Sequence, residues 1–136
     1  MQELPEKIYI ISDEKIRAEQ IQSLIHNSVK SAIDVAILNT SHFDTPGNFP
    51  DNALYIIDLV STNEPSGFLI RKVKGDQPGR KILALHIYRS AMLINPLYNM
   101  GINGYLYYNS SKEELMSAIK NIYKGKRHIP KFQWFA

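Results

Sequence analysis

Several polar side chains with useful chemistry stand directly after short apolar runs in this sequence. They are Ser12, Asp13, Glu14, Asp58, His86, Tyr108 and Asn109. A carboxylate in such a place can cap backbone N–H groups. An imidazolium can attract phosphate, whereas the phenol of tyrosine is neutral below about pH 10. If the runs are neighbouring strands, these groups converge on one edge, where ligand or switch chemistry is expected.

The apolar runs themselves predict five β-strands. They are Ile8–Ile11, Val35–Leu38, Leu54–Ile57, Ile82–Leu85 and Gly104–Tyr107. Each is rich in Ile, Val, Leu or Tyr, and none is long enough for a typical helix. Most are apolar at successive positions, which is typical of strands buried on both faces of a parallel sheet.

Helical signals lie between the strands. Residues 14–27 predict a helix capped by Asp13, and residues 68–74 predict a short one that ends at Gly75. Asn95 and Pro96 could open a helix that ends at residue 101.

The last helix has the clearest start. Ser111 and Glu114 have the spacing of a capping box, Ser110 and Glu113 offer a second register, and the helix stops at Gly125. By contrast, proline and glycine interrupt residues 41–50, so only an irregular crossover or a single turn is expected there.

Strands that alternate with helices predict a parallel α/β sheet with right-handed crossovers. For one domain of 136 residues, the leading candidate is the flavodoxin-like three-layer sandwich with strand order 2-1-3-4-5 and a degenerate second helix. Ligands of such folds bind at the carboxyl ends of the strands, beside the topological switch point. The polar residues after the strands are therefore the candidate site.

Composition excludes several other classes. The chain has no cysteine, so disulfides and thiolate catalysis are excluded and a cytoplasmic location is expected. No apolar run approaches the roughly 20 residues of a membrane helix, and no membrane partner is expected. A net charge of +3 is too mild to imply nucleic acid. The basic end is interpreted as a solvated helix face and linker; it comprises Lys120, Lys124, Lys126, Arg127 and Lys131.

Several stretches, in order along the chain, carry a family resemblance. They are Lys7–Glu14, Tyr55–Leu59, Ile82–Leu85, Met100–Leu106, Ser110–Leu115 and Lys124–Pro130. Together they resemble CheY-like receiver domains of bacterial response regulators, in particular those that carry a helix-turn-helix output domain of the NarL/LuxR type. The resemblance places a receiver in residues 1–131 and a tail, or the start of a linker, in residues 132–136.

The resemblance also implies a phosphorylation site. Asp58 matches the phosphoacceptor. Asp13 and Asp58 match the acids that bind Mg²⁺, with the backbone carbonyl of Val60 as a further ligand. Ser12 stands where the family has another acid, a place that Glu14 could fill.

The switch positions of the family depart further from its pattern. His86 replaces the serine or threonine that hydrogen-bonds the phosphoryl group, and Tyr108 replaces the lysine, with Asn109 in place of the usual proline. Mg²⁺ binding is therefore expected to be weak, and phosphotransfer weak or absent, because the missing groups supply much of the electrostatic stabilisation.

The resemblance implies a signalling module and not an enzyme, namely a two-component receiver that regulates transcription. Its expected partners are a sensor histidine kinase and a second copy of the chain in a homodimer. DNA would be bound only through an output domain outside this sequence. The alternative is a phosphorylation-independent pseudo-receiver for dimerisation or partner docking, its face around Tyr98, Tyr105 and Tyr107 fixed in one state. A flavin or nucleotide binder is the weakest interpretation, because Ser12-Asp13-Glu14 opens with acids where a phosphate loop would be rich in glycine.

Overall fold

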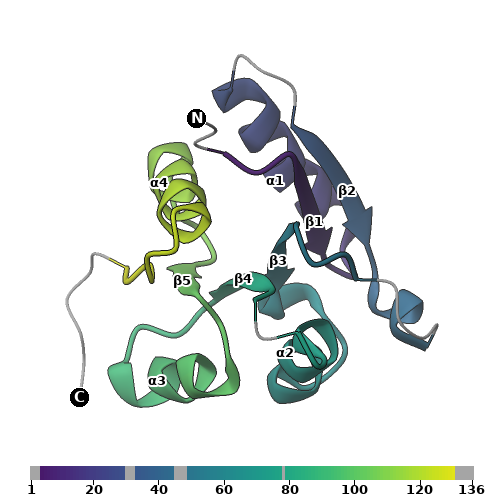
Figure 1. The fold of residues 1–136 in the computed structure, drawn as a ribbon, viewed down its shortest axis with the longest axis vertical. Helices are drawn as coiled ribbons and strands as arrows, with labels where there is room; N and C mark the ends of the chain where they lie inside the picture. The colour runs from purple at the N-terminus through teal and green to yellow at the C-terminus, as the bar shows by residue number, and fades with distance from the viewer. Residues whose placement is uncertain (1–3, 30–32, 45–48, 78, 131–136) are drawn as a thin grey trace.

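Five strands and four helices alternate along the chain in a computed structural model that describes residues 4–29, 33–44, 49–77 and 79–130 (Figure 1). The strands are β1 (Lys7–Ile11), β2 (Asp34–Leu38), β3 (Leu54–Asp58), β4 (Lys81–His86) and β5 (Gly104–Tyr107). The helices are α1 (Lys15–Ser28), α2 (Ser66–Lys74), α3 (Ala91–Met100) and α4 (Lys112–Tyr123). All five predicted strands are confirmed to within one residue at each end.

The strands form one parallel sheet in the order β2-β1-β3-β4-β5, which confirms the predicted fold class. In the parallel register, Ile11 pairs with Ile57, and Asp58 pairs with Leu85. The ends of β1, β3 and β4 therefore meet at one edge. This edge is the switch point of the fold, because the order reverses between β1 and β3.

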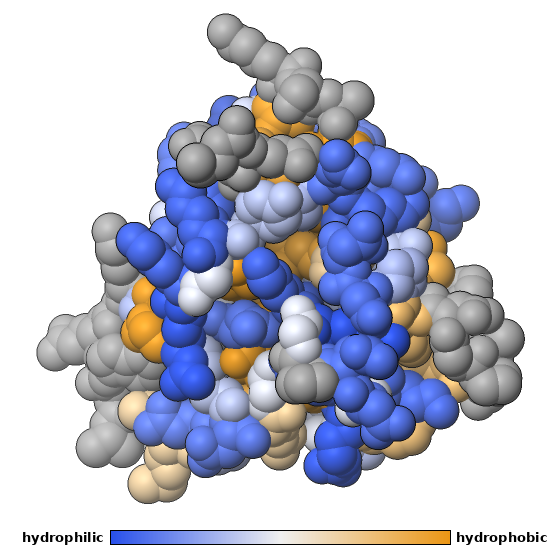
Figure 2. Space-filling model, in the orientation of Figure 1, coloured by the Kyte–Doolittle hydropathy of each residue, from blue (hydrophilic) through white to orange (hydrophobic). Residues whose placement is uncertain are grey.

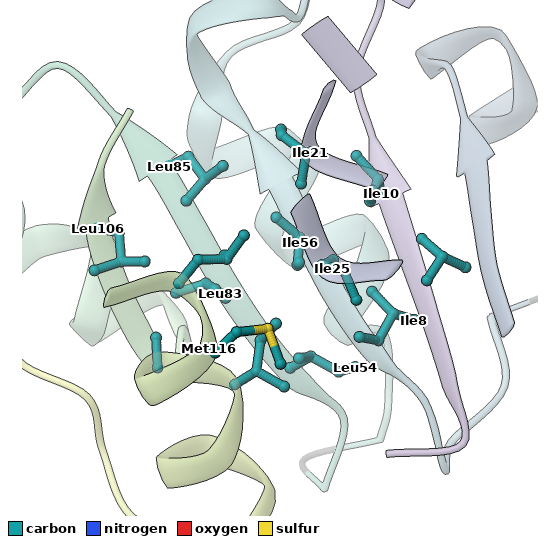
Figure 3. Packing of buried hydrophobic residues seen from close by; sticks show 14 of the residues in the cluster. Ile8, Ile10, Ile21, Ile25, Leu54, Ile56, Leu83, Leu85, Leu106 and Met116 are labelled. Carbon is teal, nitrogen blue, oxygen red and sulfur yellow. The ribbon is translucent and has the colours of Figure 1, made fainter. Parts of the chain in front are cut away.

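Two apolar layers explain why the strands lack alternation. On one face, α1 and α4 cover a core that includes Ile8, Ile56, Leu83 and Met116 (Figure 3). On the other face, α2 and α3 cover a second core (Figure 1). Every residue of β3 is buried, as expected for the central strand of a sheet with helices on both sides. Hydrophilic residues cover most of the surface that Figure 2 shows.

A short 3-10 helix, η1 (Thr40–Asp44), stands where the second helix of the fold would lie, which agrees with the single turn expected there. A second one, η2 (Leu59–Ser61), follows β3 directly. The predicted boundary at residues 131 and 132 falls outside the described residues. No helix in the described ranges has the length and apolar character needed to cross a membrane.

The starts of two helices differ from the sequence predictions. Asp13 does not cap α1: Glu14 occupies the cap position and makes no side-chain cap bond. Helix α3 begins at Ala91, not at Pro96, because Ser90 caps it by accepting a hydrogen bond from the Met92 backbone. Pro96 lies inside the helix and lacks an N–H there, a loss that the cap and the burial of the apolar face offset.

The other two helix predictions are confirmed, although α2 begins at Ser66, two residues before the predicted start. Ser111 caps α4 by accepting a hydrogen bond from the Glu114 backbone. Helix α2 ends before Gly75, which has a φ of 52°. That backbone conformation strains any residue with a Cβ, so glycine is suited to the stop.

Candidate functional site at the carboxyl edge of the sheet

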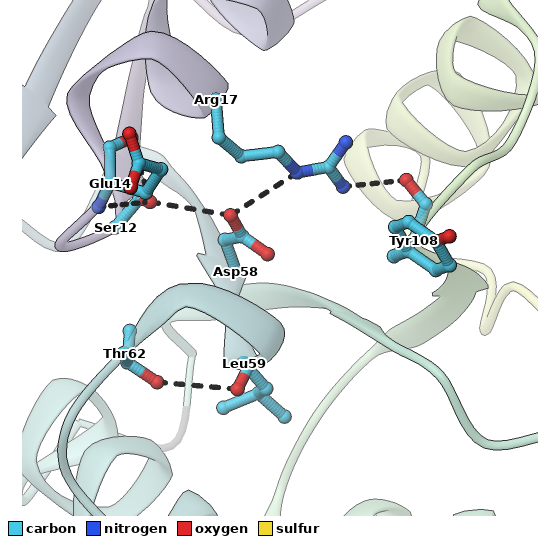
Figure 4. Close-up of polar contacts among 7 residues, drawn as sticks. All are labelled: Ser12, Glu14, Arg17, Asp58, Leu59, Thr62 and Tyr108. Atoms are coloured by element: carbon cyan, nitrogen blue, oxygen red, sulfur yellow. Dashed lines mark hydrogen bonds and ion pairs between the residues drawn. The ribbon is translucent and has the colours of Figure 1, made fainter.

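Asp58, the last residue of β3, is the centre of the candidate site. It has no exposed surface. The Ser12 hydroxyl donates to Asp58 Oδ2 over 3.2 Å, and Arg17 Nε donates to the same oxygen over 3.3 Å (Figure 4). Asp58 Oδ1 is buried and accepts no hydrogen bond within the described part of the chain. One oxygen of this carboxylate is thus paired, and the other is enclosed without a partner.

Arg17 extends from the first turn of α1 between two other elements (Figure 4). While Nε pairs with Asp58, Nη2 donates to the backbone carbonyl of Tyr108 over 2.5 Å. The guanidinium carbon also lies 5.5 Å from the centre of the Tyr108 ring, within the range of a cation–π contact. One cation therefore connects α1, the end of β3 and the segment after β5.

Asp13 has a different set of partners. Its Oδ1 accepts the Thr40 backbone N–H over 2.7 Å, and its Oδ2 accepts the Thr40 hydroxyl over 2.8 Å and the Asn63 backbone N–H over 2.9 Å. Burial alone would raise the pKa of Asp13, but these hydrogen bonds to its charged form together hold that pKa below its usual value. The carboxylate thus anchors the segments after β2 and after η2.

This arrangement does not suit Mg²⁺. The ion needs several free oxygen ligands in octahedral geometry, whereas Asp13 accepts bonds from two loops and Asp58 faces a guanidinium. No cluster of three acidic or histidine side chains that could hold a metal occurs within the described ranges. The Glu14 side chain is exposed at the start of α1, and Val60 lies in η2. The magnesium site expected from the sequence remains a prediction for titration.

The two remaining switch positions are His86, which lies near Asp58, and Tyr105, which lies on β5. His86 ends β4, its ring centre is 4.1 Å from that of Tyr88, and its buried Nδ1 has no partner among the described residues. Burial lowers the pKa of His86, and the nearby Asp58 charge opposes that shift only in part. Tyr105 is fully buried, and its hydroxyl donates to the Tyr88 carbonyl over 2.6 Å.

Comparison with solved structures identifies the architecture. The isolated receiver domain of RcsB from Salmonella enterica serovar Typhimurium, with the phosphomimetic BeF₃⁻, superimposes with a TM-score of 0.74 over 93% of this chain and 94% of that one, at 17% identity. This chain has the fold of a response-regulator receiver domain. A LuxR-family two-component response regulator from Aurantimonas gives a TM-score of 0.68 at 20% identity, over 91% of this chain and 89% of that one.

A longer RcsB chain from Salmonella typhimurium gives a TM-score of 0.75 at 17% identity. The match covers 94% of this chain but only 63% of that regulator. A scan against protein-family models and a search of curated proteins both found no match. The likeness therefore lies in the receiver fold, and the chemistry must be argued from the residues of the site.

Sequence reasoning placed Ser12, Asp13, Asp58 and His86 at the carboxyl edge of the receiver fold, and the structure places them there. It missed Arg17. One signal could have found it: α1 has no acid in its first turn, where the helix dipole favours negative charge, and has Lys15 and Arg17 instead. A cation in that disfavoured place indicates a nearby anionic partner, and Asp58 is that partner.

Proposed function

We propose that this chain is a receiver-fold signalling domain that works without phosphate on Asp58, as a dimerisation or partner-docking module. The proposal rests mainly on one observation, the Arg17 guanidinium 3.3 Å from the buried Asp58 carboxylate. A positive charge fixed at that place does what a metal ion would do for the carboxylate. The site is therefore electrostatically satisfied before any phosphodonor arrives.

Access to Asp58 supports the same proposal. Its unpaired Oδ1, the oxygen available for attack on phosphorus, has almost no solvent-accessible surface. A phosphodonor could reach it only after the surrounding segments move. Arg17 opposes such movement, because it also holds the Tyr108 carbonyl on the far side of the site.

The switch position Tyr105 on β5 has features of a single fixed state. Tyr105 is buried with its hydroxyl bonded to Tyr88, so its ring cannot turn outward without losing that bond. A ligand shifts a two-state equilibrium only by its differential affinity for the two states. With His86 and Tyr108 at the usual phosphoryl-binding positions, little differential affinity for phosphate is available.

A conventional receiver function remains the second candidate, because Asp58 Oδ1 accepts no hydrogen bond in the described residues and is chemically free to accept phosphate. That function would include a sensor histidine kinase as phosphodonor, weak Mg²⁺ binding, a homodimer, and regulation of transcription through an output domain outside this sequence. Both candidates are signalling roles in a bacterial cytoplasm, and neither is an enzyme in its own right.

Sedimentation with acetyl phosphate, or with beryllofluoride and millimolar Mg²⁺, separates the two candidates. We expect the untreated protein, the treated protein and the Asp58→Asn variant to sediment alike, and intact mass to show no added phosphoryl group. A change in sedimentation coefficient that appears on treatment and is absent in Asp58→Asn would overturn the proposal and support the conventional receiver.

Two sets of variants sharpen this experiment. Arg17→Gln should gain some Mg²⁺ or beryllofluoride binding, because it removes the resident cation, whereas Arg71→Gln, at an exposed arginine of α2, should gain none. Replacing His86 with Thr and Tyr108 with Lys restores the family's residue types at two positions. The change in sedimentation on treatment with beryllofluoride and Mg²⁺ should be largest when this double variant also carries Arg17→Gln. Failure of every combination to respond would show that Arg17 is not what blocks the site.

A further inference from the structure

The chain that leaves α4 turns back and lies beside β5 (Figure 1). We call residues Lys126–Pro130 the strap. Its centre, His128, forms a parallel bridge with Gly104 and donates its backbone N–H to the Asn103 carbonyl over 2.9 Å. His128 and Pro130 are both buried. The strap thus covers the start of β5, which is the edge strand of the sheet.

The strap fits closely because residue 104 is glycine. A Cβ at that position would lie 2.7 Å from Ile122 Cδ1 and 3.0 Å from His128 Cβ. A side chain there would force the Ile122 side chain or the strap to shift. Two further contacts hold the strap to α4: the Lys126 backbone donates to the Asn121 carbonyl over 2.8 Å, and the Asn121 amide lies 3.2 Å from His128 Nδ1.

One carbonyl of the strap joins two elements. The His128 oxygen accepts the Tyr98 hydroxyl from α3 and, over 3.4 Å, the Tyr105 backbone N–H from β5. The Arg127 guanidinium lies 5.1 Å from the centre of the Tyr98 ring. Burial raises the pKa of Tyr98 to about 12, so the hydroxyl remains a donor throughout the physiological range. The carbonyl keeps both partners only while α3 and β5 hold their present relative position.

From this geometry we propose that the strap detaches from β5 when α3 moves. The strap would thereby couple the position of α3 to the chain beyond Pro130. When α3 moves relative to β5, the His128 carbonyl loses Tyr98, and the strap separates from the sheet edge. Movement of α3, for example on docking of a partner, would thereby change how the following segment is held. This route does not pass through Asp58, so it stands whether or not that residue accepts phosphate.

The first test removes only the Tyr98 hydroxyl. In Tyr98→Phe, hydrogen exchange of the His128 amide should become roughly two- to tenfold faster, because one hydrogen bond that closes the strap is lost. Tyr107→Phe is the matched control, because Tyr107 is also a tyrosine near this end of the molecule on β5 and its ring contacts Arg89 and Tyr108. Exchange of buried β3 amides shows whether the whole fold has been weakened. An unchanged His128 rate would overturn the proposal.

The second test asks whether the strap reports on α3. Ser90→Ala removes the cap at the far end of α3, about 12 Å along the helix from Tyr98. It should also speed His128 exchange severalfold. Ser110→Ala deletes a serine hydrogen bond in the segment between β5 and α4 and should not. If Tyr98→Phe speeds His128 exchange but Ser90→Ala does not, α3 holds the strap in place but its movement is not transmitted to the strap, and the proposal fails.

The third test follows the chain beyond Pro130. Trp134 is the only tryptophan, so its fluorescence anisotropy observes that segment alone. We expect the anisotropy to differ from the wild-type value in Tyr98→Phe and in Ser90→Ala but not in Tyr107→Phe. Anisotropy that stays constant while His128 exchange accelerates would show that the strap does not control the following segment.

Discussion

Asp13 follows β1 and Asp58 ends the neighbouring strand β3, yet the surroundings of the two carboxylates differ in kind. Asp13 is partly exposed and accepts hydrogen bonds from neutral donors of two loops. Asp58 is fully buried and pairs with a hydroxyl and a guanidinium through one oxygen only. The first carboxylate organises backbone, whereas the second is neutralised by a cation.

The difference follows from burial. A partly solvated carboxylate is satisfied by N–H and O–H donors, and such bonds fix the segments that supply them. A carboxylate out of contact with water carries a large desolvation cost unless a positive charge lies beside it. Receivers that bind Mg²⁺ solve that problem with metal; here α1 supplies Arg17. Asp58 therefore pairs with a cation from within the chain.

The largest effect should come from removing the cation. Arg17→Met keeps an apolar stem but leaves the buried Asp58 charge without its partner, so the free energy of unfolding in urea should fall by about 3 kcal/mol. If the loss comes from that stranded charge, adding Asp58→Asn to Arg17→Met should recover most of it. Equal losses with and without Asp58→Asn would mean that the ion pair is not what stabilises this edge.

A smaller effect is expected at Asp13. Asp13→Ala deletes the bonds to Thr40 and Asn63 and should lower the unfolding free energy by about 2 kcal/mol. Because the folded state depresses the pKa of Asp13, its contribution is complete above the unfolded value of about 3.9 and is lost as pH falls through the folded value. Urea titrations from pH 6 to pH 2 should show this dependence in the wild type and a weaker one in Asp13→Asn. Identical curves would contradict the anchoring role.

The smallest effect should come from His86, which faces Asp58 from β4. Burial depresses the pKa of His86 in the folded state, so its contribution to the unfolding free energy is fully present above the unfolded pKa of about 6.5. That contribution declines as pH falls through the folded pKa, by under about 1 kcal/mol down to pH 5.5. An NMR titration should place the ring below pH 6.5. Asp58→Asn should lower that pKa further, because the Asp58 charge favours the imidazolium. A pKa above 6.5 in the wild type would contradict this account.

Much of the receiver fold could be predicted from local patterns. Short apolar runs identified the five strands, because burial on both faces leaves no polar alternation. The Ser111 cap and the Gly75 stop were predictable as well, since caps depend on residues close in sequence. The start of α3 was predicted wrongly: Pro96 looked like a first helical residue, but the Ser90 cap and the burial of Ile94 and Leu97 extend the helix before it.

The sequence by itself determined which residues gather at the carboxyl edge, because parallel strands bring their ends together once their order is known. Only the tertiary structure decided how those residues pair. Arg17 meets an acid 41 positions away and a carbonyl 91 positions away, and Tyr98 meets the strap 30 positions on. Such contacts depend on how helices pack across the sheet, and no local pattern encodes that geometry. Packing therefore decided that Asp58 pairs with Arg17.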